Sequence, residues 1–184
     1  TIMRNALTAL YGEEPETVDL SGIIDYSLYW IIALHDYVLH IGDTQFLHRA
    51  RPLIRRLLAA LEAREDGRGL LPTASLSWVF IDWTDLVHRG YSSSLHMLYV
   101  MALEAAAQLC TLDADPAQTT RLVARANKLR STCRRLFWDT QRNLYVDNCI
   151  EETPGDHVSR HASFFAVLSG VATEDQIPGI LDRV

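Results

Sequence analysis

The sequence predicts an all-α protein, part of an (α/α) toroid with an inner and an outer ring of helices. Segments that are apolar on nearly every side alternate with segments that carry one apolar stripe, and this pair occurs three times in 184 residues. A helix that is apolar all round is normally buried, whereas a single stripe leaves one face in water. The connections within a pair are short and those between pairs are long. A double ring requires strict alternation of buried helices and helices with one solvent-exposed face.

The first pair occupies residues 23–65. Residues 23–41 are apolar almost throughout, and Gly42 is suited to end this inner helix. Asp43 is suited to cap an outer helix over residues 44–65. Within that segment leucine, isoleucine and alanine recur every three or four positions while arginines cover the other side, which is the spacing of an amphipathic helix.

The second pair repeats the pattern. Residues 92–111 form the apolar member, and residues 116–138 form the striped member, with Pro116 in its first turn. Cys133 falls on the apolar stripe, so we expect a buried thiol there. Asp115 has the same place before its helix as the capping aspartate of the first pair, and the two are 72 residues apart.

The third pair is shorter. Residues 158–169 form its inner helix, and a last amphipathic helix follows with Thr173 as its cap. Residues 1–10 fit the outer helix of a preceding pair, so the chain holds three hairpins and a leading helix. A helical solenoid also stacks helix pairs and is the alternative, although its repeats are usually shorter.

Composition narrows the function classes. The chain is 48% apolar and 22% charged, which argues against a disordered tail, and no charge-free apolar run has the length of a membrane span. A net charge of −6 argues against a nucleic-acid or anionic-membrane surface. Three cysteines are too few for a disulfide framework or a zinc site. No phosphate-binding glycine loop or signal peptide is visible, so we expect no cofactor and favour a cytoplasmic protein.

The three long connections, residues 11–23, 67–91 and 140–157, mark one functional face. In antiparallel hairpins all three must emerge at the same end, where the inner helices also begin. Long loops in a compact domain are usually functional. We therefore expect this elaborated end to be an active-site or binding face.

The second of these loops holds the most suggestive residues. Asp82 and Asp85 lie beside Trp78 and Trp83. Aromatic faces next to carboxylates suit sugars, because the ring stacks on C–H groups while the carboxylates accept hydrogen bonds from hydroxyls. The alternative is a loop anchored by tryptophan, in which an aspartate bonds backbone amides.

The starts of two inner helices add further candidates. Tyr26 and Trp30 follow Asp25, which has the place of a helix cap. His157 and His161 lie four residues apart at the third inner helix, where His161 is suited to bind a hydroxyl. That spacing also occurs in zinc sites, but no carboxylate or cysteine accompanies it in a ligand pattern, so we predict no metal.

Four segments resemble the catalytic domain of bacterial α-L-rhamnosidases, glycoside hydrolase family 78: IIDYSLYWIIALHDYVLHIGDTQFL, WVFIDWTD, LFWDTQRNLYVD and VSRHASFFAVLSGVA. The resemblance covers almost the whole chain in the same order. It implies a six-hairpin toroid, of which residues 1–184 are a partial domain and about half. It also implies removal of terminal α-L-rhamnose with inversion, in which one carboxylic acid protonates the leaving oxygen and a second carboxylate activates water.

The resemblance assigns sugar contacts but no catalytic residue. No position here matches the family's acid or base motif, so we predict that this chain alone is inactive. Asp82, Trp83 and Asp85 match the sugar-contacting loop, and Tyr26, Trp30 and His161 are expected in the same cavity.

The expected ligand is a small-molecule or oligosaccharide rhamnoside. The open edges of a partial ring also predict self-association. Two other functions stay open: a noncatalytic carbohydrate-binding toroid, and a helical scaffold that binds a protein partner.

Overall fold

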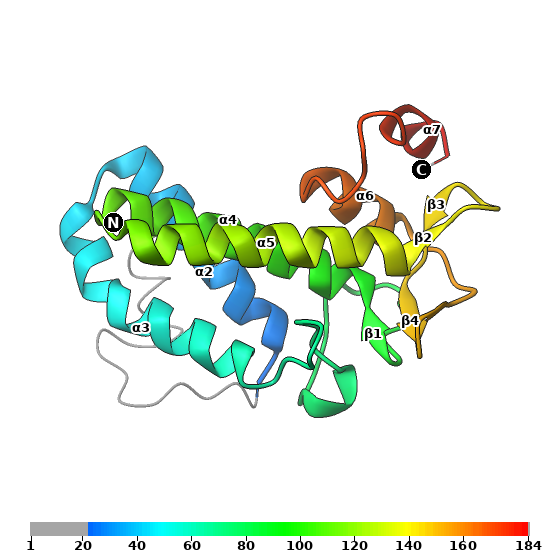
Figure 1. Cartoon of the computed structure of the whole chain (residues 1–184), viewed down its shortest axis with the longest axis horizontal. Helices are drawn as coiled ribbons and strands as arrows, with labels where there is room; N and C mark the ends of the chain where they lie inside the picture. Colours follow the sequence, from blue (N-terminus) through cyan, green and yellow to red (C-terminus); the bar gives the residue numbers. More distant parts are fainter. Residues whose placement is uncertain (1–21, 184) are drawn as a thin grey trace.

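The computed structural model describes residues 22–183, which form a layered array of helices with short strands at one end (Figure 1). The helices are α2 (Ile24–Ile41), α3 (Thr44–Glu62), α4 (Ser93–Leu112), α5 (Pro116–Phe137), α6 (Arg160–Leu168) and α7 (Ile177–Leu181), with a 3-10 turn at Thr73–Ser75. The strands are β1 (Tyr91–Ser92), β2 (Trp138–Asp139), β3 (Leu144–Tyr145), β4 (Asn148–Ile150) and β5 (Thr153–Pro154).

The alternation of inner and outer helices is confirmed. The inner helix α4 is buried on nearly all sides and contacts α2, α5 and α6. The outer helices α3 and α5 bury only one stripe each. Cys133, on the stripe of α5, is fully buried as expected. The core therefore lies between the two layers of helices.

The turns within the first two pairs are built as the sequence predicts. The side chain of Asp43 accepts a hydrogen bond from the amide of Phe46 at 2.9 Å, and that of Asp115 accepts one from the amide of Gln118 at 3.2 Å. Gly42 ends α2 at φ +75°, a backbone conformation that favours glycine. These short turns lie at the opposite end from the strands (Figure 1).

The helix ends differ from the prediction at two places. Helix α3 stops at Glu62 rather than at residue 65, and the last helix is a single turn that starts at Ile177. The carbonyl of Thr173 is used by the amides of Gln176 and Ile177, so a turn precedes that helix. Pro178 has no amide hydrogen to donate, which confines it to the first turn. The leading helix expected at residues 1–10 lies outside the described residues.

One described helix, α4, is long and apolar enough by length and composition to cross a membrane. About two thirds of its apolar window, 67%, is buried inside the protein. The core helix of a soluble protein passes the same test, so this feature alone decides nothing about a membrane.

The two long connections that lie within the described residues, 67–91 and 140–157, pair with each other through the strands. Strand β4 lies between β1 and β5 in an antiparallel sheet, and β2 pairs with β3. Gly90, at φ +82°, allows the close approach of β1 to β4, because a Cβ there would lie 2.3 Å from the carbonyl oxygen of Cys149. The loop before α4 is thus joined to the loop before α6.

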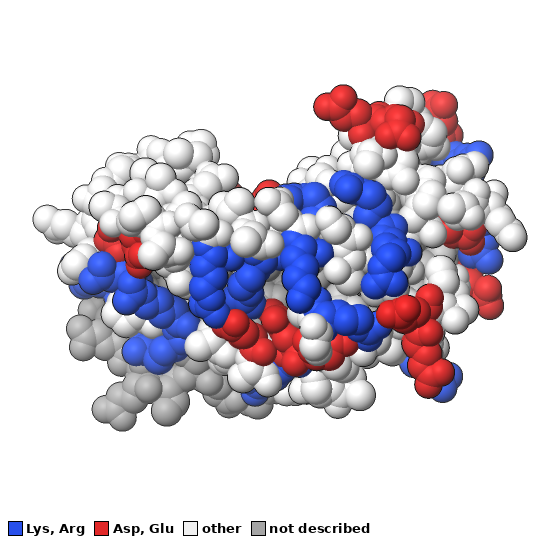
Figure 2. Space-filling view, in the orientation of Figure 1, with Lys and Arg blue, Asp and Glu red and all other residues white. Residues whose placement is uncertain are grey.

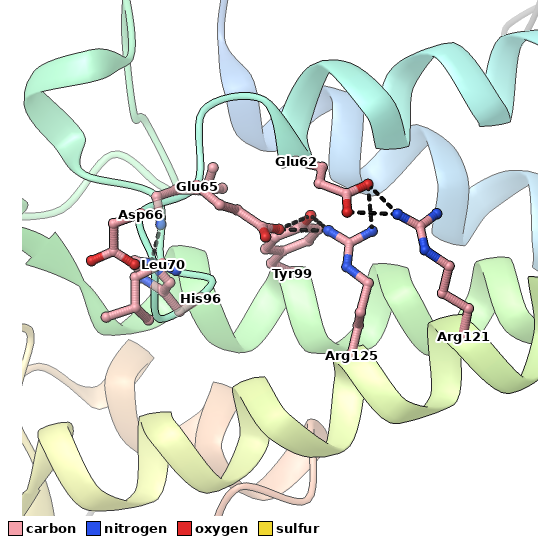
Figure 3. A network of polar contacts seen from close by, with 9 residues as sticks. Glu62, Glu65, Asp66, Leu70, His96, Tyr99, Arg121 and Arg125 are labelled. Atoms are coloured by element: carbon pink, nitrogen blue, oxygen red, sulfur yellow. Dashed lines mark hydrogen bonds and ion pairs between the residues drawn. The ribbon is translucent and has the colours of Figure 1, made fainter.

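Charged side chains form a second layer of contacts on the outer wall. Figure 2 shows basic side chains in a band across this face with acidic ones beside them. Arg121 on α5 bonds both carboxylate oxygens of Glu62, at 2.5 and 2.6 Å. Arg125 bonds Glu65 at 2.6 Å and the hydroxyl of Tyr99 at 2.7 Å, and this hydroxyl donates to Glu65 (Figure 3). Burial raises the pKa of Tyr99, which keeps it a donor.

We call these residues, with Asp66 and His96 beside them, the outer-wall network (Figure 3). A cavity of about 240 Å³ lies among its charged groups. The guanidinium groups of Arg121 and Arg125 are already paired with carboxylates of the protein. The network therefore joins the end of α3 to α4 and α5.

Candidate functional site

The loop that follows α3 is fastened to the start of α2. The amide of Ile24 donates to the carbonyl of Trp78 at 3.1 Å. The fully buried carboxylate of Asp25 accepts hydrogen bonds from the amides of Phe80, at 3.0 Å, and Ile81, at 3.2 Å. Asp25 is therefore not a cap of α2, the commoner role at that position. It holds a loop from another part of the chain.

A strained turn follows directly. Ile81 has φ +58°, and the amide of Asp82 donates to the carbonyl of Phe80 at 2.7 Å across it. Left-handed backbone is rare for a β-branched residue and costs on the order of 1–3 kcal/mol. Such conformations persist only where the surrounding structure enforces them, and they gather at functional sites.

The turn brings Asp82 to His161, 79 positions further along the chain. The Nε2 of His161, in the first turn of α6, donates to the Oδ2 of Asp82 at 2.9 Å. The amide of Trp83 donates to the other oxygen at 2.7 Å. These bonds, with that from His161 the larger effect, lower the pKa of the Asp82 carboxyl below its ordinary value. Asp82 is therefore an ionised carboxylate that is held in place but exposed to solvent.

An aromatic group lies beside this pair. The ring of Phe80 packs edge-on against Trp83 at 5.0 Å, Trp78 at 5.8 Å and Tyr26 at 6.5 Å between centroids. Trp83 is 90% exposed, so its indole offers an open face. Burial, followed by the charges of Asp25 and Asp82, raises the pKa of the Tyr29 hydroxyl. That group stays protonated and able to donate.

The other predicted site residues differ in how exposed they are. Asp85 is exposed on the same loop, two residues beyond Trp83, and Tyr26 is 46% exposed at the start of α2. Trp30 was expected in the cavity, but it is 5% exposed and belongs to the core. It lies one turn further along the same side of α2 than Tyr26, where the helix is covered by the rest of the core.

A second buried aspartate organises the loops before α4 and α6. Asp147 accepts hydrogen bonds from His157 Nδ1 at 2.6 Å, the amide of Ser159 at 2.8 Å and, at 3.4 Å, that of Val87. Its carbonyl accepts from the amide of Ser93 at 2.8 Å. His157 is thus engaged with Asp147 rather than with its neighbour four residues on. Within residues 22–183 no cluster of three potential metal ligands occurs.

His88 was not among the sequence candidates. Its Nδ1 lies 3.0 Å from the hydroxyl of Ser92, and burial lowers its pKa although Asp147 and Asp25 act in the opposite direction. No local sequence pattern marks these roles: Asp25 bonds amides 55 and 56 positions away, and His88 and Asp147 act within loops whose paths other elements set. The nearest signal in the sequence was the pair of segments DYSLYW (residues 25–30) and FID (residues 80–82), which contain the anchor Asp25 and the loop that it bonds.

The geometry suits the binding of a polyhydroxy ligand. Asp82 supplies acceptor lone pairs, Tyr29 supplies a donor, and Trp83 supplies a flat apolar surface. Asp25 and Asp147 are occupied by backbone amides. Groups for holding a sugar are therefore present on this face.

Similarity to known proteins agrees with this picture at the level of fold. A rhamnosidase of family GH78 from Bacillus sp. GL1 superposes with a TM-score of 0.82 at 22% identity, over 98% of this chain and 20% of that one. The fold is that of a GH78 rhamnosidase. A rhamnosidase from Klebsiella oxytoca with rhamnose bound superposes with a TM-score of 0.81 at 23% identity, over 98% of this chain and 36% of that one.

The rhamnosidase fold is an (α/α) toroid, and the chain is a mostly helical part of one. In sequence, an N,N′-diacetylchitobiose phosphorylase from Vibrio furnissii is 24% identical over 176 residues, which cover 84% of this chain and 22% of that protein. No family model matches the chain. The chain spans between about a fifth and a third of the length of these relatives.

Proposed function

We propose that this chain is the sugar-contacting part of a glycoside hydrolase that removes terminal α-L-rhamnose from glycosides. The observation that supports it most is the Asp82–His161 pair beside the exposed indole of Trp83. This pair lies at the start of an inner helix of a rhamnosidase fold, and one structural relative has rhamnose bound. A rhamnoside, as a small molecule or at the end of an oligosaccharide, is the proposed ligand.

Each group has a role that its chemistry supports. The Asp82 carboxylate accepts hydrogen bonds from sugar hydroxyls, and His161 fixes its orientation. Trp83 stacks against the apolar C–H face of the ring. Tyr26 and Tyr29 border the same space from α2, and Asp85 is available on the loop.

The proposed reaction is hydrolysis with inversion in a ring of six hairpins. It needs a carboxylic acid on the leaving oxygen and a carboxylate that activates water. We propose that neither is supplied by the residues discussed above. Asp25 and Asp147 bond backbone amides, and Asp82 is held ionised by His161, which does not suit a general acid at neutral pH.

Binding and turnover test this proposal separately. The chain, titrated with L-rhamnose by NMR, should show shifts in the Trp83 indole and His161 ring signals that saturate. Asp82→Ala should weaken this binding about tenfold or more, because a hydrogen bond to a charged group is lost. The exposed Asp36 on α2 provides the control Asp36→Ala. Equal affinity in all three proteins, or no saturation, would count against the site.

For turnover, the parent protein and this chain are assayed on an aryl α-L-rhamnoside. We expect release of rhamnose by the parent and none by the chain. Binding without turnover in the parent would favour a noncatalytic carbohydrate-binding toroid. Retention of a protein partner by Asp82→Ala and Trp83→Ala variants that no longer bind sugar would favour the helical scaffold.

A second candidate reaction is phosphorolysis, which the chitobiose phosphorylase relative supports. The two reactions differ in the acceptor, which is water in one and inorganic phosphate in the other. The parent protein assayed with and without phosphate distinguishes them. A sugar phosphate formed only with phosphate would replace the hydrolase proposal.

We also propose that the open edges of this partial ring associate. Apolar side chains are exposed on α2, at Leu39 and Ile41, and on α6, at Phe164 and Leu168. Exposed apolar surface favours association. Light scattering of the chain should show a mass that rises with concentration, and a constant monomer mass would exclude this.

A further inference from the structure

The sugar-facing loop carries a conformation that its own sequence does not favour. Ile81 is β-branched and lies at φ +58°, yet the residues on either side of it form the site. Phe80 carries the aromatic group, and Asp82 carries the bond to His161. Something outside the loop must hold this turn, because the turn alone is unfavourable.

Asp25 is placed to do so. Its two carboxylate oxygens accept from two consecutive amides, those of Phe80 and Ile81, at 3.0 and 3.2 Å. The side chain has no exposed surface, and burial of a carboxyl group is unfavourable unless hydrogen bonds such as these compensate for the lost water. Both amides point toward the start of α2, and the carbonyl of Phe80 is left to bond the amide of Asp82.

We propose that Asp25 is a positioning residue that enforces the left-handed backbone at Ile81 and thereby directs Asp82 toward His161 and Trp83 into solvent. The carboxylate clamps the loop at residues 80 and 81, and the three residues beyond it present their side chains outward. Where this concerns sugar affinity, it rests on the proposed function. Where it concerns the shape of the loop, it does not.

A second clamp on the same loop offers a comparison. Asp147 bonds the amide of Val87 at 3.4 Å, and its stronger bonds go to His157 and Ser159. Asp147 therefore fastens the loop near its return to α4, away from the strained turn. If Asp25 acts through the turn, the two aspartates must have different effects on Asp82.

The decisive variant is Asp25→Asn, which keeps the volume of the side chain but replaces one acceptor oxygen with an NH2 group. One of the two amide bonds is lost, and a donor then faces a donor. We expect the carboxyl pKa of Asp82, followed by carbon NMR, to rise toward its ordinary value as the bond from His161 weakens. The Trp83 indole signal should shift, and L-rhamnose affinity should fall about tenfold. Asp36→Asn, on the same helix, should change none of these.

A double-mutant cycle separates positioning from simple packing. Glycine adopts left-handed backbone without strain, so Ile81→Gly removes the need for an anchor. In the Ile81→Gly background, Asp25→Asn should change the Asp82 and Trp83 signals much less than it does in the original protein. Equal effects in both backgrounds would show that Asp25 does not act through the turn, and would overturn the proposal.

Failure of the variant to fold would not leave the question open. In the unmodified chain, hydrogen exchange should be slower at the amides of Phe80 and Ile81 than at that of the exposed Thr84. Fast exchange at both amides would overturn the clamp directly. If the Asp82 and Trp83 signals respond as expected but no rhamnose binds, the positioning role stands and the proposed function fails.

Discussion

Two regions of this molecule use polar side chains in opposite ways. In the outer-wall network the guanidinium groups of Arg121 and Arg125 are matched by Glu62 and Glu65 within the protein. On the loop at residues 78–83, Asp82 and Trp83 direct their groups to solvent, and Ile81 holds strained backbone. In the first arrangement the polar groups bond one another and join helices, while in the second they stay accessible to a ligand. Changes in the wall should therefore affect stability, and changes in the loop should affect binding.

The largest expected effect comes from His96, at one end of the outer-wall network (Figure 3). It is fully buried, and burial lowers its pKa to about 4. Its Nε2 accepts from the amide of Leu71 at 2.9 Å, so this nitrogen must stay unprotonated. The unfolded chain takes up a proton near pH 6.5. Stability is thus complete above pH 6.5 and should fall by about 3 kcal/mol as the pH drops toward 4.

Denaturant unfolding between pH 7 and 4 measures this loss. The exposed His48 provides the matched control, because His48→Gln leaves His96 in place and the loss of stability toward pH 4 should persist. A chain that keeps its full stability at pH 4.5 would show that His96 is not the buried neutral acceptor described above.

The next effect tests the wall itself. Arg125→Met removes the charge that pairs with Glu65 and the donor that bonds Tyr99, both of which are largely shielded from water. We expect a loss of about 2 kcal/mol in the free energy of unfolding. Arg121→Met, at a more exposed pair, should cost less than about 1 kcal/mol. Rhamnose affinity should stay unchanged in both, and a loss of binding would break the division between the regions.

These two regions also differ in how far sequence predicts them. The alternation of helices, the caps Asp43 and Asp115, and the buried thiol of Cys133 are confirmed, because each depends on spacing within one or two turns. The predicted end of α3 and the predicted start of the last helix were wrong, because turns form at these places instead of helix.

The candidate site could be predicted only in part. Asp82 and His161 were both predicted, and the structure brings them together because the loop at residues 67–91 meets the start of the inner helix α6. Trp30 lies in the core at 5% exposure, one turn beyond the half-exposed Tyr26, and the sequence could not show this because burial along α2 depends on elements distant in the chain. Asp25 and Asp147 were missed as anchors. A buried carboxylate that bonds distant amides has no local signature.

A smaller effect is expected at Asp82 when stability is measured. Asp82→Asn keeps the size of the side chain but removes the charge that His161 and the Trp83 amide stabilise. The carboxylate is exposed, so the midpoint of thermal unfolding should move by no more than about 2 °C. Rhamnose affinity should nevertheless fall about tenfold. A large fall in the midpoint would place Asp82 with the wall residues instead.

The smallest effect on stability is expected at Trp83, the most exposed aromatic side chain on this loop at 90%. Among the described residues the ring of Trp83 packs against Phe80 alone, so Trp83→Ala should change the free energy of unfolding by less than about 0.5 kcal/mol. If the indole stacks on a sugar, affinity for rhamnose should fall several-fold, and Trp83→Phe should restore part of it because a flat ring returns. Loss of affinity that phenylalanine does not restore would mean that the indole orders the loop rather than contacting the sugar. Trp83 would then be a structural residue, like those of the outer-wall network.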